Sequence, residues 1–417
     1  MGINAGCADE ILLKKSIDIT EFDDGTEQGS YLVRCNDRCW KVSAFVYVFL
    51  SALHDTPKLS SVKNYFQEHY HIALQEKQIN DVLNFLTENN LLEGSEDTKH
   101  RKKSVLWMRI TLLPAALVRK IRVFTPLFRR ACIIPLSALC LAWMFFIFFM
   151  YPSGELAGQI QQLSPLYFLL AYLIILSITL IHELGHSSAL LYHGGTPGRI
   201  GTAFYFFMPV LFSDVTDTWR LKRKSRFLVD YGGIYFQMII SMLIFAVNHL
   251  FLHNQIVTMA VCLSALQVIS NLNPFIKMDG YWMLCDAIGS TNVTALMFSV
   301  ILNLFRREEN RSPQVKALSK EKRIILLIYS VLFAAFITYF SLFIVKSFLL
   351  AVTTIRSDLH ILLTASDTLT FTPQTVLQYL SSRFTKYIIL IFSLRTVFGL
   401  IGKLAGGLQK RRTAHAA

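Results

Sequence analysis

Charged residues are scarce in this sequence, and cysteine, glycine and proline form no dominant pattern. Asp, Glu, Lys and Arg make up 17% of the 417 residues, against about 25% in ordinary soluble domains. The seven cysteines are scattered, and the 20 glycines and 11 prolines are too few for a collagen-like chain. Hydrophobic residues make up 53% of the chain. These values exclude collagen-like, disulfide-scaffold and disordered proteins and argue against a soluble enzyme.

The charge is divided unevenly along the chain. Residues 1–98 hold 16 acidic and 8 basic residues, whereas residues 99–417 hold 12 acidic and 33 basic residues. The basic part is also the apolar part, and positive charge beside apolar spans is what orientation in a bilayer requires. We therefore interpret most of the net charge of +13 as topological, and we expect no nucleic-acid partner, because the acidic front part repels phosphate.

Residues 20–96 are expected to form a small α+β unit of one hairpin and three helices. The hairpin strands, 31–35 and 38–42, are joined by Asn36 and Asp37, which suit a tight turn. The expected helices run from Ala44 to Leu53 after a Ser43 cap, from Ser60 or Ser61 to about Tyr70, and around residues 82–86. This is the outline of a winged helix.

Two short motifs in this unit carry a resemblance. Trp40-Lys-Val-Ser43 and the closing Asn89-Asn-Leu-Leu92 resemble PqqD-like domains, which hold the leader of a ribosomally made precursor peptide. The resemblance implies that a leader peptide is added as an extra strand at a sheet edge. DNA binding and a mere folding or regulatory appendage are the alternatives. The polar, acidic residues 1–30 contain no signal peptide, so we expect a cytoplasmic domain at residues 1–98.

The rest of the chain is expected to be a multi-pass, mainly α-helical transmembrane bundle of about six spans. Residues 99–130 are predicted to be a basic linker, in which 105–128 lies on the membrane as an amphipathic helix. Residues 131–417 would form the membrane domain. The expected spans are residues 131–150, 165–181, 227–252, 256–276, 324–345 and 387–404. The last of these carries Arg395, and its alternative is an interfacial helix.

The basic loops set the expected orientation. Lys and Arg cluster before the first span, after the second, after the fourth and at the end of the chain, whereas loops 151–164 and 253–255 contain none. With six spans, every basic loop falls on one side of the bilayer. We therefore expect both termini in the cytoplasm, and the bilayer to be the bacterial cytoplasmic (inner) membrane.

A metal-ligand motif, His182-Glu183-Leu-Gly-His186, follows the apolar run 166–181. The same helix is expected to continue through it, and positions i and i+4 share one helix face. His182 and His186 can therefore both offer a ring nitrogen to Zn²⁺, with Glu183 as general base toward water. The alternative is a set of polar residues that snorkel from a helix end. We disfavour this alternative, because ionisable residues within a bilayer are costly and usually mark a functional site.

A zinc site needs a third protein ligand. His193 is rejected, because the metzincin spacing would place a His where Tyr192 stands. Asp279 is favoured; it follows the fourth span in Asn271-Leu-Asn-Pro274-Phe-Ile-Lys-Met-Asp279-Gly280. Pro274 breaks that span, and irregular backbone at membrane depth is tolerated only where protein or a polar cavity covers it. The six-span topology also returns Asp279 to the side of the two histidines.

Together the two motifs resemble those of the site-2-protease family of intramembrane zinc metallopeptidases. One is His-Glu-x-x-His at the end of a span, and the other is Asn-x-x-Pro-x-x-x-x-Asp-Gly at the end of a later span. The resemblance implies that His182, His186 and Asp279 bind Zn²⁺. It also implies that Glu183 is the catalytic acid/base and that Asn271 holds or polarises the substrate.

The resemblance covers residues 165–290 and includes two departures. Met278 stands where the family has Leu, and Gly233-Ile-Tyr-Phe-Gln237 replaces Gly-Pro-x-x-Asn. The subgroup that fits is the peptide-processing zinc metalloproteases, whose members can carry a PqqD-like domain. The implied function is an intramembrane endopeptidase acting on a modified precursor peptide at the cytoplasmic side. Alternatives are cleavage of a membrane-anchored regulator, a non-catalytic peptide escort or exporter, and a membrane-tethered transcription regulator.

A short apolar stretch, residues 203–212, is interrupted by Pro209 and is too short to span a bilayer. It is interpreted as a re-entrant hairpin near the site, whose β edge could align a substrate, or equally as a buried loop beneath the catalytic helix. Asp214 and Asp217 follow it, and turn or cap roles are favoured for both over metal binding.

Overall fold

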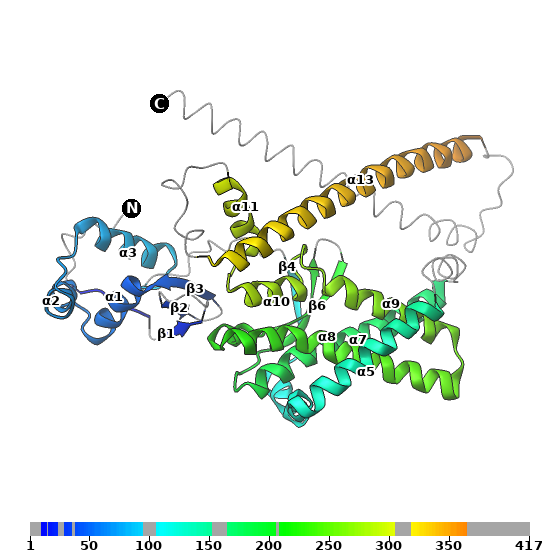
Figure 1. Cartoon of the computed structure of the whole chain (residues 1–417), viewed down its shortest axis with the longest axis horizontal. Helices are drawn as coiled ribbons and strands as arrows, with labels where there is room; N and C mark the ends of the chain where they lie inside the picture. The colour runs from blue at the N-terminus through cyan, green and yellow to red at the C-terminus, as the bar shows by residue number, and fades with distance from the viewer. Residues whose placement is uncertain are drawn as a thin grey trace. The chain divides into compact units, whose positions relative to one another are not determined.

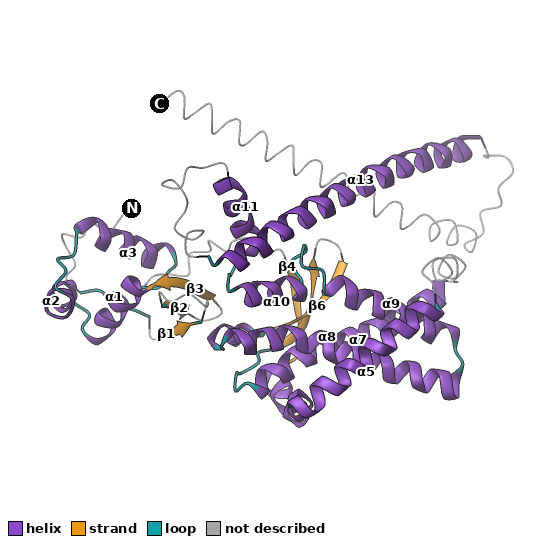
Figure 2. Cartoon of the chain, in the orientation of Figure 1, coloured by secondary structure: helices purple, strands orange, loops and turns teal. Residues whose placement is uncertain are grey.

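Where the computed structural model describes the chain, it is mostly helical, with two small sheets (Figures 1 and 2). It divides into two compact units, which are described separately. The first comprises Met1–Phe146, Ile175–Asn254 and Val261–Thr294, and the second comprises Ile147–Ile174, Gln255–Ala260 and Ala295–Ala417. The residues described are 10–14, 16–23, 29–35, 38–94, 106–151, 165–205, 208–304 and 318–364.

The front module of the first unit is an antiparallel sheet followed by three helices. The strands, in spatial order, are β1 (Ile17–Phe22), β2 (Ser30–Cys35) and β3 (Arg38–Ser43). The helices are α1 (Ala44–Asp55), α2 (Leu59–Tyr70) and α3 (Glu76–Glu88). The predicted hairpin and three helices are confirmed, and the Ser43 hydroxyl caps α1 by accepting a bond from the Val46 N–H. Helix α2 begins at Leu59 without a side-chain cap, and β1 was not predicted.

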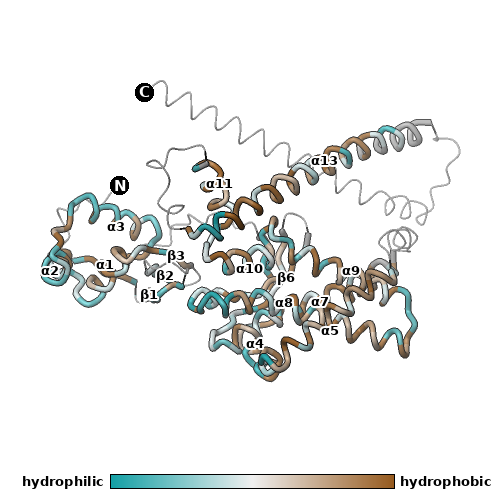
Figure 3. The backbone as a smooth tube through the Cα atoms, viewed as in Figure 1, coloured by the Kyte–Doolittle hydropathy of each residue, from teal (hydrophilic) through white to brown (hydrophobic). Residues whose placement is uncertain are grey.

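This module has its own hydrophobic core. Helix α3 buries one face, formed by Ile79, Val82, Leu83 and Leu86. That face packs in one cluster with apolar side chains of α1, α2 and the sheet. The tube is mostly teal along α2 and α3, whereas it is brown along much of α5 and α13 (Figure 3). The periodic spacing of apolar residues therefore accounts for the three helices.

The segment before the first span differs from the prediction of one amphipathic helix. Leu106–Leu113 forms strand β4, followed by α4 (Ala115–Val118) and the 3₁₀ helix η1 (Arg119–Phe128). Strand β4 pairs antiparallel with β5 (Ile200–Tyr205), which pairs with β6 (Met208–Ser213) in the order β4-β5-β6. Long-range pairing outweighs the local helical pattern here. Residues 203–205 and 208–212 thus lie in paired β-strands.

Among the described residues, four helices are long and apolar enough to cross a membrane, or up to five if one bent pair counts as a span. The four segments are Arg130–Met150, Leu169–Tyr192, Arg223–Leu252 and Lys320–Leu350, and the bent pair is Asp279–Ile288 with Val293–Asn303. They fall in α5 (Arg130–Met150), α7 (Pro165–Tyr192), α8 (Arg223–Val247) with η3 (Asn248–Leu252), α10 (Asp279–Ile288), α11 (Val293–Leu304) and α13 (Lys320–Thr364).

The expected fourth span, residues 256–276, is shorter than predicted. It forms α9 (Gln255–Asn271), a 17-residue apolar helix that ends before Pro274. Proline disfavours a helical conformation at its own position and at the residue before it. Helical structure resumes only at α10. The other expected span, 387–404, lies outside the described residues.

Helices α7 and α8 touch at their backbones. A β-carbon on Gly185 of α7 would collide with the carbonyl group of Gly232 on α8, and one on Gly232 would meet the side chain of Ala189 at 2.8 Å. Only glycine at these positions permits so close a crossing. The crossing brings the motif on α7 against α8, which also contacts α10 extensively.

Candidate metal centre

Three side chains converge at the junction of α7, α8 and α10. His182 and His186 lie one turn apart on α7, and Asp279 is the first residue of α10. The two Nε2 atoms are 3.0 Å apart. The His182 Nε2 atom lies 3.1 Å from Asp279 Oδ2, and the His186 Nε2 atom lies 3.5 Å from Asp279 Oδ1. The structure thus brings together the three predicted ligands as a possible metal site.

The hydrogen bonds at the Nδ1 atoms of the two histidines determine which ring nitrogens are available to bind a metal. His186 Nδ1 lies 2.8 Å from the Val229 carbonyl oxygen, which can only accept, so this nitrogen carries the proton. His182 Nδ1 lies 3.0 Å from Gln237 Oε1 and donates to it in the same way. Both Nε2 atoms are therefore free to donate a lone pair, an arrangement typical of metal-binding histidines.

The set of donor atoms fits a small divalent cation. Two imidazole lone pairs and a carboxylate face one another within 4.8 Å, and Coulomb repulsion between such donors is relieved by a cation. Donor atoms about 2 Å from a tetrahedral Zn²⁺ lie about 3.3 Å from each other, close to the separations of 3.0, 3.1 and 3.5 Å. Nitrogen and carboxylate ligands are also those that Zn²⁺ takes.

Gln237 supports the site from α8. Its side chain is fully buried, and its Nε2 group donates to the Ser264 carbonyl at 3.3 Å, to Ser264 Oγ at 3.2 Å and to Gln267 Oε1 at 3.2 Å. These bonds turn the Oε1 atom toward His182. From the sequence, Gln237 could be seen only as an amide that stands where the resembled motif has Asn; the structure shows that it bonds to the imidazole of the candidate ligand His182.

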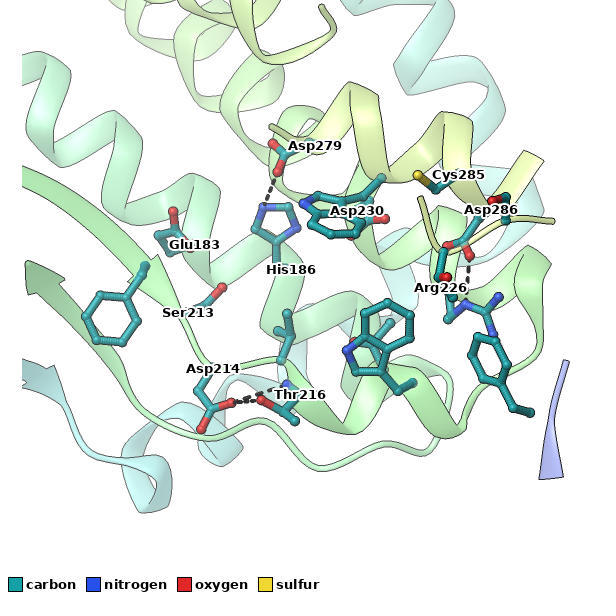
Figure 4. A pocket seen from close by; sticks show the side chains of 18 of the residues that line it. Glu183, His186, Ser213, Asp214, Thr216, Arg226, Asp230, Asp279, Cys285 and Asp286 are labelled. Atoms are coloured by element: carbon teal, nitrogen blue, oxygen red, sulfur yellow. Dashed lines mark hydrogen bonds and ion pairs between the residues drawn. The ribbon is translucent and has the colours of Figure 1, made fainter. Parts of the chain in front are cut away.

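Glu183 and the metal centre border a cavity of about 430 Å³. Glu183 is 8% exposed, and in Figure 4 its carboxylate lies on the same side of the cavity as His186 and Asp279. The volume far exceeds the roughly 30 Å³ share of one water molecule. Among the cavity's other lining residues are Phe22, Leu211, Phe212, Ser213, Trp219, Arg226, Asp230, Trp282 and Asp286.

Two predicted acids have structural roles. The Asp214 carboxylate accepts bonds from the Thr216 N–H at 3.2 Å and its hydroxyl at 2.7 Å, a turn arrangement. Asp217 accepts from the Thr196 N–H at 2.9 Å and pairs with Arg34 at 2.7 Å. The predicted turn role is confirmed for Asp214. Asp217, in the first turn of the 3₁₀ helix Thr216–Arg220, instead bonds to residues distant in the sequence.

Asn271 and His193 lie outside the three-ligand group. Asn271 ends α9 and is 7% exposed; its contact with substrate remains a prediction. His193 follows α7, and burial lowers the pKa of its imidazole. The metal-ligand group found among the described residues does not include His193, in agreement with its rejection on spacing.

Comparison with known proteins gives a weak but consistent result. No family model matches the chain, and no solved structure matches it. The chain is similar to a Bacillus subtilis (strain 168) protein named "Putative peptide zinc metalloprotease protein YydH", with 26% identity over 105 residues. The match covers 25% of this chain and 42% of that protein. This distant relationship supports a metalloprotease-type function.

Proposed function

We propose that the chain is an intramembrane zinc endopeptidase of the site-2-protease type that hydrolyses a peptide bond in a precursor peptide. The observation that carries this proposal is the convergence of His182, His186 and Asp279 beside Glu183 at one cavity. When bound there, Zn²⁺ supplies Lewis acidity, which lowers the pKa of a water ligand to about 7 and polarises a carbonyl.

Glu183 moves the proton in this proposal. Its carboxylate takes a proton from the attacking water and delivers it to the nitrogen of the leaving amine. Glu183 follows His182 directly on α7, and this helix is fixed by its contact with α8. A general base must lie within reach of both the water and the leaving group, and a position on a fixed helix supports this role for Glu183.

Strand β6 is suited to hold an extended substrate. It is an edge strand of the sheet β4-β5-β6, and its last residues, Leu211, Phe212 and Ser213, line the cavity. A peptide paired along β6 would form main-chain hydrogen bonds and would be led toward the metal centre. Asn271 ends α9, shortly before Asp279 in the sequence. We assign to Asn271 the role of holding the substrate carbonyl.

The front module would bind the leader of the substrate, as in PqqD-like domains. Its β3 strand lies at the edge of the sheet and, among the described strands, pairs only with β2. A leader added to β3 would leave the cleavage region free to reach the cavity. With both termini in the cytoplasm of a bacterial cell, a newly made peptide would meet the protease at the cytoplasmic side of the inner membrane.

Co-expression with small open reading frames near the gene tests this function. Masses of the encoded peptides are compared between wild type and Glu183→Gln, with Glu68→Gln on the exposed surface of α2 as the control. We expect Glu183→Gln to lower cleavage by about 10²–10⁴-fold while the zinc content stays near one per chain. Unchanged processing by Glu183→Gln would contradict the proposal and favour an escort role.

A further inference from the structure

The front module contacts the catalytic part at the end of β1. Arg226 of α8, which is 4% exposed, donates from Nη2 to the Asp23 carbonyl at 2.8 Å. The Arg223 N–H donates to Asp23 Oδ2 at 3.1 Å. Arg34 of β2 pairs with Asp217 at 2.7 Å. These contacts join residues about 200 positions apart, so the end of β1 is held directly against η2 (Thr216–Arg220) and the start of α8.

Phe22, the last residue of β1, takes part in the cavity wall. It is 3% exposed, its ring centroid is 6.0 Å from that of Trp219, and the Trp219 ring is 6.3 Å from that of Trp282 in an edge-on arrangement. All three aromatic side chains line the cavity that Glu183 and His186 also line. One wall of the cavity next to the metal centre is thus aromatic, and part of it comes from the front module.

The charges at this end of the cavity are already paired. Arg226 donates from Nε to Asp286 Oδ1 at 2.7 Å and lies 4.7 Å from the centroid of the Phe22 ring. Figure 4 shows this ion pair across the cavity from Glu183, whereas Asp230 lies nearer His186. A charged side chain of the substrate would gain little electrostatic attraction here, because the charges of Arg226 and Asp286 already neutralise each other. An aromatic side chain would gain apolar contact and edge-to-face ring packing.

We propose that Phe22, Trp219 and Trp282 form a subsite for an aromatic side chain of the substrate. Phe22 would then be a specificity-determining residue that the front module supplies to the active site. The inference rests on the proposed peptidase function. It adds a second role for the front module, beside holding a leader, because the module also selects the residue that enters the cavity.

Peptide binding to full-length protein in nanodiscs tests the subsite separately from cleavage. The zinc-loaded Glu183→Gln protein is titrated into dye-labelled alanine hexapeptides with one central Phe, Leu, Lys, Glu or Ala. We expect the Phe peptide to bind about tenfold or more tightly than the Ala peptide, because filling an apolar pocket contributes affinity of this size. Adding Phe22→Ala should reduce that ratio to within about twofold of unity.

Two further variants keep the test decisive. Tyr65→Ala removes an aromatic ring from α2 of the same module, away from the lining of the cavity, and should leave the Phe/Ala ratio unchanged. Trp282→Leu alters the wall from the catalytic side and should lower the ratio even if Phe22→Ala impairs folding. Retention of the ratio in folded, zinc-binding Phe22→Ala and Trp282→Leu proteins would overturn the proposal, as would preference for Lys.

The outcomes also separate the subsite from the enzyme function. Selective binding of the Phe peptide without cleavage of any peptide by wild type would leave the subsite standing and defeat the peptidase proposal. Cleavage of the hexapeptides by wild type without a preference for Phe would confirm a peptidase and defeat the subsite.

Discussion

Replacing Gln237 with leucine should weaken zinc binding even though the three candidate metal ligands remain in the protein. Leucine is apolar and cannot accept the His182 Nδ1–H, which now bonds to Gln237 Oε1 at 3.0 Å. The imidazole would lose the bond that fixes its orientation and tautomer. The Nε2 atom would then no longer be held toward His186 and Asp279. We therefore expect a loss of affinity with all three ligands still present.

The size of the effect follows from the bonds that are lost. Gln237 is fully buried, and its amide bonds to His182 on one side and to Ser264 and Gln267 on the other. Loss of one buried hydrogen bond, with its partner left unsatisfied, costs about 1–3 kcal/mol. A loss of about 2 kcal/mol corresponds to roughly 30-fold in Kd, within the 10–100-fold range for partners of metal ligands.

Competition with a zinc chelator of known affinity measures this change on detergent-purified protein. Ser241→Ala is the matched control, because Ser241 is buried one turn further along α8 and bonds to Ser264 but not to a ligand. We expect the control to bind zinc within about threefold of wild type, a margin of under 1 kcal/mol. A folded Gln237→Leu protein with wild-type zinc affinity would refute the assignment of Gln237 as support for His182.

Two other changes test the packing around the site. Gly233→Ala should abolish zinc binding, because a β-carbon there would collide with His186 and come within 2.7 Å of His182 Nε2; stoichiometric zinc in the purified variant would contradict this geometry. Arg34→Ala and Asp217→Asn should be coupled in thermal unfolding by about 1 kcal/mol, because their side chains pair at 2.7 Å. Additive effects of the two substitutions would show that the contact contributes no stability.

The front module shows where local sequence is sufficient and where it is not. The β2–β3 hairpin is predicted by Asn36 and Asp37, and α1 by the Ser43 cap, because both signals act within a few residues. Strand β1 was missed because its residues, Ile17–Phe22, lie in a polar, acidic stretch. Its pairing with β2 supplies the stability that its own pattern does not indicate.

Strand β4 was mispredicted for a related reason. Its partner, β5, begins 87 residues after β4 ends, so the pairing depends on the folded arrangement of the helices between them. A window of sequence that contains Trp107 and Arg109 gives no sign of that partner. The local pattern therefore suggested a helix on the membrane, whereas tertiary pairing made a strand.

At the site, the candidate ligands were predictable and the groups that support them were not. His182, His186 and Asp279 are identified by fixed spacing and by the chemistry of their side chains. The Val229 contribution is a backbone carbonyl, which any residue type could supply. The place of Phe22 at the cavity depends on docking between distant segments, and no local pattern encodes it.

Strand β4 also affects how the chain can be divided. A fragment that started at Arg130 would discard β4 along with the front module and leave β5 with an unpaired edge, which invites self-association. Starting shortly before Leu106 would preserve the three-stranded sheet. Exchange of front modules between related proteins should respect the same junction, because β4, the first strand of the sheet β4-β5-β6, is encoded ahead of the first apolar helix.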